Sequence, residues 1–410
     1  MLSTFHLIPL AVVAAGLYVS TPQRVPALDW PHWRGPNHNG ISAEKGWLTS
    51  WPKEGLKTLW KAKVGIGFSA VTVSAGKAYT MGNAQEKDTV FCFDATTGAV
   101  IWKHSYPAPL DPRYYDGGAS CTPTVDGSVV YTLSRRGILL AMDAATGAVR
   151  WEKNLAKDLS LKVPEWGFAG APLVRGKLLI LNAGGLGTAV DKSSGEVIWT
   201  NGKESAGYSA ALPYSHFGKD AVAFAALQHI AAVETATGKV LWKFPWETQY
   251  DINAADPIIQ GEEVFVSSGY EHAGAVLRLQ KAGDPTQLWK NKSLKTQFST
   301  AVVIDGHIYG VDGNTGRDCT LTCLEWRTGA VKWQKKGVGM GSLMAADGKL
   351  IIQWEKGELV LVSARADKYE ELSRAQVMGG KSWTQPVLAN GKIYVRNATG
   401  DVVCVDVSGR

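Results

Sequence analysis

The stretch Asp143-Ala-Ala-Thr-Gly147-Ala-Val-Arg-Trp151 joins an acidic residue, a short polar turn, a glycine and a tryptophan. The same order of residue types returns along almost the whole chain at nearly regular intervals. Its clearest copies are residues 94–102, 191–199, 234–242 and 325–333. The stretch is therefore one copy of a sequence repeat.

Weaker copies extend the series. One occupies residues 279–289, and another occupies residues 362–372, where Leu372 stands at the place of the tryptophan. We therefore expect this seventh unit to be the loosest. A half-copy at residues 402–409 lacks its last strand, and residues 58–64 look like that missing strand. The two segments are expected to complete one unit and close a ring.

Each copy has the chemistry of a β-hairpin turn. An Asp or Glu side chain can accept hydrogen bonds from the backbone of its own turn, and glycine readily takes the positive φ of the corner. The flanking residues alternate with the period of a strand, so the tryptophan is expected on one face of an outer strand, filling the wedge between neighbouring sheets. The expected wedge residues are Trp60, Trp102, Trp151, Trp199, Trp242, Trp289 and Trp333.

A second, earlier hairpin occurs in each unit. It is marked by pairs such as Asp126-Gly127, Asp305-Gly306 and Asn390-Gly391, which are strong signals for tight turns between strands. Two hairpins give four strands, and residues 57–410 divided among eight units give about 44 residues each, the period of propeller blades. The predicted fold is an all-β, eight-bladed propeller of four-stranded antiparallel blades, closed by N- and C-terminal strands that share a blade.

The recurring turn and tryptophan resemble the tryptophan-docking repeat of the PQQ-like, or quinoprotein alcohol dehydrogenase-like, β-propellers. The resemblance covers nearly all of the chain after its first residues and is specific for the fold. It implies less about function, because this family contains both redox enzymes and non-catalytic scaffolds. The architecture is similar to that of the propeller lipoprotein of the bacterial barrel-assembly machine. A lipid-anchoring cysteine is missing, however, since the first cysteine is Cys92.

The segments before the repeats have a different composition. Residues 1–27 are predicted to be a signal peptide, because their apolar run is too short to span a bilayer comfortably and Val25-Pro-Ala27 has the form of a cleavage site. The region before the run lacks Lys and Arg, so an uncleaved anchor is the alternative. Residues 28–56 form an arm rich in Trp and Pro that is expected to lie against the propeller at 57–410. We expect an exported bacterial protein, periplasmic or secreted.

Composition and charge narrow the possible partners. Hydrophobic residues make up 45% of the chain, which supplies an ample core, and the net charge of +6 is scattered rather than clustered. Nucleic-acid binding is therefore not expected, nor is a transmembrane span in the mature chain, and a monomer is expected. Cys92, Cys323 and Cys404 occupy a position that other units give to alanine, which predicts a buried slot for a small residue and few or no disulfides.

The loops that lead into the innermost strands are the candidate binding site. They are rich in aromatic rings, which suit stacking on sugars, quinones or extended peptides. The alternative is that several of these rings plug the channel or pack between blades. The candidate rim residues are Phe68, Tyr114, Tyr115, Asp116, Trp166, Phe168, Tyr208, Asn253, Asp256, Phe298 and Trp383, with Ser120, Tyr250, Gln297 and Ser342 nearby.

Resemblance to the quinoprotein dehydrogenases raises the question of catalysis. Those enzymes hold pyrroloquinoline quinone between a Trp and a disulfide of adjacent cysteines, with calcium bound by Glu, Asn and Asp. This chain has no Cys-Cys pair, and Trp166, Asn253 and Asp256 are suitable in type but do not match the family's motifs in order. We therefore expect no catalytic residue, metal or cofactor.

The predicted function is a non-catalytic scaffold that binds an extracytoplasmic protein or a small ligand such as a saccharide at its aromatic loop face. The alternative is a dehydrogenase-like oxidoreductase that uses pyrroloquinoline quinone and calcium.

Replacing one wedge residue tests the role of the repeat in stability. Trp151→Ala should lower the free energy of unfolding by about 3 to 5 kcal/mol if the ring is wedged between blades, because a large buried side chain would leave a cavity. Chemical denaturation measures the change. A loss below about 0.5 kcal/mol, typical of a surface position, would contradict the wedge.

Overall fold

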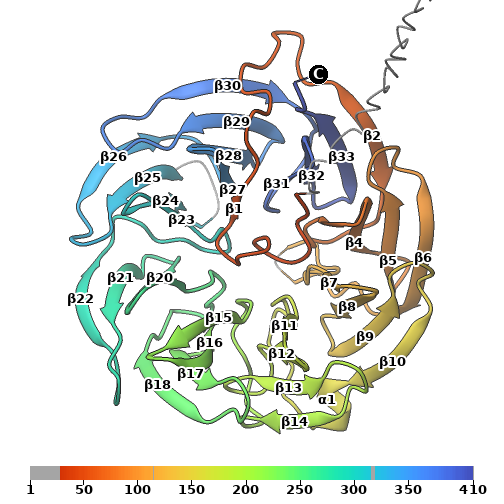
Figure 1. Ribbon diagram of the computed structural model, residues 1–410, viewed down its shortest axis with the longest axis vertical. Helices are drawn as coiled ribbons and strands as arrows, with labels where there is room; N and C mark the ends of the chain where they lie inside the picture. Colours follow the sequence, from red (N-terminus) through yellow and green to blue (C-terminus); the bar gives the residue numbers. More distant parts are fainter. Residues whose placement is uncertain (1–27, 114, 315–318, 410) are drawn as a thin grey trace, which may run out of the picture.

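The computed structural model describes residues 28–113, 115–314 and 319–409. The predicted signal peptide, residues 1–27, lies outside this part. The described chain forms an eight-bladed β-propeller, in which consecutive antiparallel sheets are arranged around a central axis (Figure 1). The predicted fold class is confirmed. In seven blades the strands run in sequence order from the axis outward, whereas the outermost strand of blade 8 is the N-terminal β2; the innermost strand is usually the shortest.

The first four blades follow one another along the chain. Blade 1 contains β3 (Thr72–Ser74), β4 (Lys77–Ala84), β5 (Lys87–Asp94) and β6 (Val100–Pro107). Blade 2 contains β7 (Thr124–Asp126), β8 (Val129–Leu133), β9 (Ile138–Asp143) and β10 (Val149–Asn154). Blade 3 contains β11 (Leu173–Arg175), β12 (Leu178–Leu181), β13 (Thr188–Asp191) and β14 (Val197–Thr200). Blade 4 contains β15 (Leu212–His216), β16 (Lys219–Ala225), β17 (His229–Glu234) and β18 (Val240–Pro245).

The remaining four blades complete the ring. Blade 5 contains β19 (Ile258–Gln260), β20 (Glu263–Ser268), β21 (Ala273–Arg278) and β22 (Thr286–Asn291). Blade 6 contains β23 (Val302–Ile304), β24 (His307–Asp312), β25 (Thr320–Glu325) and β26 (Val331–Lys336). Blade 7 contains β1 (Ile41–Ser42), β27 (Gly341–Ala346), β28 (Lys349–Trp354), β29 (Glu358–Ser363) and β30 (Glu371–Gln376). Blade 8 contains β2 (Thr58–Lys63), β31 (Val387–Ala389), β32 (Lys392–Arg396) and β33 (Asp401–Asp406).

Helix is scarce in the described part. A single turn, α1 (Leu155–Asp158), follows β10 and is capped by Asn154, whose side chain accepts a hydrogen bond from the backbone N–H of Lys157. Across the described ranges, no helix has the length and apolar character needed to cross a membrane.

The two ends of the chain together close the ring, as predicted. The N-terminal strand β2 pairs antiparallel with the C-terminal strand β33, and Trp60 lies opposite Cys404. Figure 1 shows β2 beside β33 at the outer edge of blade 8. The last blade is therefore built from segments that lie more than three hundred residues apart in the sequence.

The repeated turns have the predicted hydrogen bonds. In blade 2, the side-chain oxygen Oδ1 of Asp143 accepts from the backbone N–H groups of Ala145 and Thr146, both at 3.0 Å. Gly147 follows with φ of 74°. The Arg150 guanidinium, together with these turn donors, lowers the pKa of Asp143 to about 2. The acid and the glycine therefore fix the corner of the hairpin.

In six blades a tryptophan on the outermost strand contacts the next blade. Trp60 of blade 8 lies so close to the turn of blade 1 that a Cβ on Gly98 would be 2.6 Å from its ring. Its Nε1 donates to the carbonyl of Ala95 in the same turn. Equivalent hydrogen bonds to the next blade, 2.7–3.1 Å long, are made by Trp102, Trp151, Trp199, Trp289 and Trp333. Trp242 differs, because its Nε1 donates to the hydroxyl of Tyr214 in its own blade.

An alanine or a cysteine lies directly across the strand pair from each of these rings except Trp289, which lies opposite Val276. A register shift after the turn places Trp102 opposite Cys92, Trp151 opposite Ala141, and Trp333 opposite Cys323. The predicted buried slot for a small residue is confirmed, since Cys92, Cys323 and Cys404 have no exposed surface. A larger side chain there would compete with the tryptophan for the same space.

Blade 7 departs from the sequence expectation. The register shift pairs Leu361 with Ser373, so Ser373 rather than Leu372 holds the place of the tryptophan. The Ser373 hydroxyl donates to the carbonyl of Thr49 and accepts from the backbone N–H of Trp51, and Trp51 packs into the core that blades 7 and 8 share. The N-terminal arm therefore supplies packing to this blade that a local sequence pattern could not reveal.

The arm, residues 28–56, crosses one mouth of the central channel (Figure 1). Trp30 exchanges backbone hydrogen bonds with Val73 in blade 1, and the carbonyl of Pro31 accepts from Val125 in blade 2. Strand β1 then pairs parallel with β27, adding a fifth strand to blade 7. Blade 7 therefore has five strands rather than the predicted four, because the arm covers its inner edge.

A buried arginine secures the seam between blades 8 and 1. Arg396, at the end of β32, is 1% exposed and donates to the carbonyl oxygens of Ser69, Met81 and Gly65. Burial lowers the pKa of Arg396 to about 9. Its guanidinium therefore satisfies backbone acceptors on the neighbouring blade that water does not reach.

Arg396→Met tests this seam. Methionine keeps the apolar stem but leaves the carbonyls of Met81 and Gly65 without the donors that Arg396 supplies, at about 1 to 3 kcal/mol each, so unfolding should become easier by about 2 to 6 kcal/mol. The matched control Arg365→Met removes a side chain that is 44% exposed and should cost less than about 1 kcal/mol. Urea denaturation of both variants gives the comparison, and equal costs would rule out a special role for Arg396.

Candidate functional site

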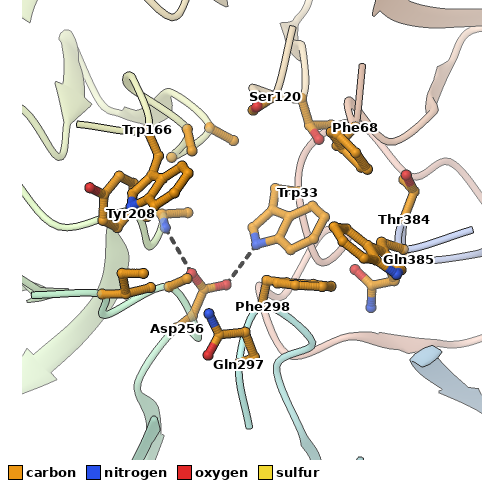
Figure 2. Close-up of a pocket in the computed structure, with 18 of the residues that line it drawn as sticks. Trp33, Phe68, Ser120, Trp166, Tyr208, Asp256, Gln297, Phe298, Thr384 and Gln385 are labelled. Atoms are coloured by element: carbon orange, nitrogen blue, oxygen red, sulfur yellow. Dashed lines mark hydrogen bonds between the residues drawn. The ribbon is translucent and has the colours of Figure 1, made fainter. Parts of the chain in front are cut away.

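A cavity of about 280 Å³ lies where the loops of the ring converge. Most of its lining residues belong to the segments that lead into innermost strands, from Phe68 before β3 to Trp383 before β31. The arm bonds to the innermost strands β3 and β7 through the backbone of Val73 and Val125, and its Trp33 also lines the cavity. Figure 2 shows Trp33 at the middle of the lining side chains. The arm therefore forms a floor that turns the channel into a blind cavity.

The structure brings most of the predicted rim residues together. Those that line the cavity are Phe68, Tyr115, Trp166, Tyr208, Asp256, Phe298 and Trp383, along with Ser120 and Gln297. They come from seven blades, so only closure of the ring places them side by side.

Other predicted rim residues lie elsewhere. Phe168 is fully buried in the core that blades 2 and 3 share. Asn253 is also fully buried, and its amide nitrogen donates to the carbonyls of Ala226, Leu227 and Trp246. For these two the packing alternative is the observed one, because neither side chain lines the cavity.

Three further candidates lie outside the cavity or outside the described residues. Asp116 forms an ion pair with Lys381 at 2.7 Å and is not among the lining residues. Tyr250 is 55% exposed and packs edge-on against Tyr270. Tyr114 falls outside the described residues.

Several lining residues were missed by sequence reasoning. Trp33 is one of four tryptophans in the arm, and nothing in their spacing tells which one enters the channel. Thr384 and Gln385 follow the predicted Trp383, and Tyr270 comes from the loop between β20 and β21. The position of Thr384 and Gln385 directly after Trp383 in the sequence is the one signal that could have identified them as lining residues.

Five aromatic rings form a continuous arc along the wall. Ring centroids are 5.0 Å apart between Phe298 and Trp383 and 5.6 Å between Trp383 and Phe68. The arc continues from Phe68 to Tyr115 at 5.5 Å and from Tyr115 to Trp166 at 5.8 Å. Each ring supports its neighbour, so their orientations are fixed before any ligand arrives. We call these five residues the aromatic arc.

Asp256 is the carboxylate of the cavity, and its hydrogen-bonding capacity is largely used. Its Oδ2 accepts from Trp33 Nε1 at 2.6 Å, and its Oδ1 accepts from the backbone N–H of Ala210 at 2.7 Å (Figure 2). Arg34 lies 3.9 Å away, with its side chain 3% exposed. Burial raises the pKa of Asp256, while Arg34 and Trp33 act in the opposite direction. The carboxylate therefore holds the arm in place and is poorly suited to act as a free base.

The residues present do not fit the quinone and calcium of the dehydrogenases. Calcium needs about six to eight oxygen ligands, and Asp256 and Asn253, the two residues of suitable type, already bond to protein donors and acceptors. Among the residues that the structure describes, no group of three or more His, Cys, Asp or Glu side chains could hold a metal ion. No reaction step can therefore be derived through that cofactor.

Comparison of sequences places the propeller in a known family. The family model described as outer membrane protein assembly factor BamB matches residues 86–335. The chain belongs to this family. The recognition of PQQ-like repeats is thereby confirmed. No curated protein matches the chain.

Solved structures share the fold of this BamB-like chain. BamB from Moraxella catarrhalis superposes with a TM-score of 0.63 at 16% identity, covering 87% of this chain and 98% of that chain. Quinohemoprotein alcohol dehydrogenase from Comamonas testosteroni gives 0.65 at 15% identity, covering 93% and 81%. A europium-containing methanol dehydrogenase gives 0.66 at 13%, covering 91% and 89%. At such identities the likeness shows the fold alone, which enzymes and BamB share.

Asp256→Asn tests the link between the cavity and the arm. An amide has one acceptor oxygen for the two donors, Trp33 Nε1 and Ala210 N, and it removes the charge beside Arg34. We expect a loss of about 3 kcal/mol in unfolding free energy. The control Asp220→Asn, at a pair with Arg175 in which both side chains are nearly half exposed, should cost about 1 kcal/mol or less. Thermal unfolding measures both, and a neutral Asp256→Asn would refute the assigned role.

Proposed function

We propose that this BamB-like propeller is an exported binding protein that holds a ligand, or a projecting segment of a partner protein, in its central aromatic cavity without catalysing a reaction. The aromatic arc carries the proposal. Preorganised rings around a blind cavity favour binding, since their orientations need no further ordering when a ligand arrives.

Several observations support binding over catalysis. Asp256 is committed to the arm, and neither Asp256 nor Asn253 offers oxygens for a calcium ion. A base needs a lone pair that is free to reach the substrate proton, and both carboxylate oxygens of Asp256 already accept hydrogen bonds from the protein. We therefore propose that the protein acts without pyrroloquinoline quinone or another redox cofactor.

An extracytoplasmic location is also part of the proposal. The apolar run before residue 20 and the cleavage-like Val25-Pro-Ala27 support export. The name of the matching family, an outer membrane protein assembly factor, agrees with that location. It also makes a protein partner a reasonable occupant of the loop face.

Binding can be tested through the cavity tryptophans. Purified protein is titrated with a panel of sugars, aromatic amines, quinones and short aromatic peptides, and intrinsic fluorescence is recorded. We expect at least one class to give a saturable change that Phe298→Ala weakens. Phe244→Ala, which alters a half-buried ring on the outer strand β18, should leave binding intact.

Catalysis is tested in parallel. The protein is incubated with pyrroloquinoline quinone and calcium, and dye reduction is followed with alcohols and sugars as electron donors. Turnover at the background rate is expected. Robust dye reduction would overturn the non-catalytic proposal.

A further inference from the structure

We propose that the occupant of the central cavity is a neutral saccharide, an inference that rests on the proposed binding function. Three independent features of the lining lead to this class of ligand: the aromatic arc, the balance of charge at the wall, and a set of buried polar side chains with unpaired oxygens.

The aromatic arc offers flat faces to an apolar surface. The face of an aromatic ring carries partial negative charge, and the C–H groups of a sugar ring carry partial positive charge. Trp383 contacts both Phe298 and Phe68, and the arc continues from Phe68 through Tyr115 to Trp166. Figure 2 shows Trp166 across Trp33 from Phe68. Such an arc suits a ring-shaped ligand that is apolar on its faces and polar around its edge.

The charges near the arc are already balanced. The ammonium of Lys381 lies 4.7 Å from the ring centre of Trp383 and pairs with Asp116. The guanidinium of Arg135 lies 5.3 Å from the ring centre of Tyr115 and donates to backbone carbonyls. A cationic ligand would meet rings that cations already contact. An anionic ligand would meet cations whose charges are already offset by Asp116 and Asp111, the latter 3.8 Å from Arg135. The wall therefore favours a neutral ligand.

Unpaired oxygens define the polar part of the lining. Gln297, Thr384 and Gln385 are each at least nine-tenths buried, and Gln297 Oε1, Thr384 Oγ1 and Gln385 Oε1 have no hydrogen-bond partner within the protein. Figure 2 shows Thr384 and Gln385 on the side of Trp33 opposite Trp166, with Gln297 beside Phe298. An amide oxygen only accepts, so a ligand that pairs with these groups must carry several donors.

Hydroxyl groups of a saccharide supply those donors. Contact requires the side chains to turn their oxygens toward the ligand, a change that hydrogen bonding would favour, because an unpaired buried acceptor is costly. The cavity volume of about 280 Å³ is near the lower end of the range of roughly 300 to 1,000 Å³ found for small-molecule sites. The expected ligand is therefore a short saccharide or the end of a longer neutral glycan.

Titration with defined sugars tests the inference. Neutral mono- and disaccharides of glucose, galactose, mannose and N-acetylglucosamine are compared with galacturonate and with choline by calorimetry and tryptophan fluorescence. We expect saturable binding of at least one neutral saccharide, with galacturonate and choline bound at least tenfold more weakly.

A pair of matched variants tests the polar part of the lining. Thr384→Val removes the unpaired hydroxyl in the cavity without changing the size of the side chain. Thr132→Val removes another buried, unpaired hydroxyl on β8, at a residue that does not line the cavity. Loss of one hydrogen bond to the ligand should weaken saccharide binding by about threefold to tenfold in Thr384→Val, and Thr132→Val should bind as the wild type does. If both variants bound the saccharide with equal affinity, the assignment of Thr384 to the binding site would be overturned.

The outcomes separate this inference from the proposed function. If choline, an aromatic peptide or a quinone binds and no neutral saccharide does, the saccharide inference fails while the binding function stands. If no compound of any class binds, both fail. Melting temperatures of the two threonine variants within a few degrees of each other would confirm that folding is not the cause of a difference in affinity.

Discussion

Pairing between β2 and β33 is the constraint on which the rest of the propeller depends. It joins the two ends of the chain in one blade, and Trp60 and Arg396 then bind that blade to blade 1. Loops from seven blades can surround one cavity only when the ring is closed. A single long-range pairing of two strands thereby sets the geometry of a site whose residues are spread over more than three hundred positions.

The tryptophan contacts hold neighbouring blades together around the closed ring. Most of these rings rest on the turn of the next blade, opposite a small residue on their own blade, so the glycine, the small slot and the tryptophan form one unit. Where the unit is incomplete, at Ser373, the arm replaces it with Trp51. The stability of the ring is thus distributed over many similar contacts, which leaves the loops free to vary in sequence.

The arm has a second role at the centre of the molecule. It carries Trp33 into the channel, where Asp256 and Arg34 hold it. This arrangement engages the carboxylate of the cavity and adds an aromatic ring to its lining. Attachment of the arm and the lining of the cavity are therefore coupled through one carboxylate.

The sequence by itself determined the blade architecture and most of the wall. Turns, strand alternation and a fixed period are local properties, so the eight blades, the shared last blade and the small slots at Cys92 and Cys404 could be predicted from residue order. Loop aromatics such as Phe68 and Trp383 could be predicted because the loops before inner strands must converge. Only the tertiary structure decided that Phe168 and Asn253 turn away into the core, that Trp33 enters the channel and that a register shift puts Ser373 in place of a tryptophan. Those outcomes depend on contacts between segments far apart in the chain and on side-chain direction, which no local pattern encodes.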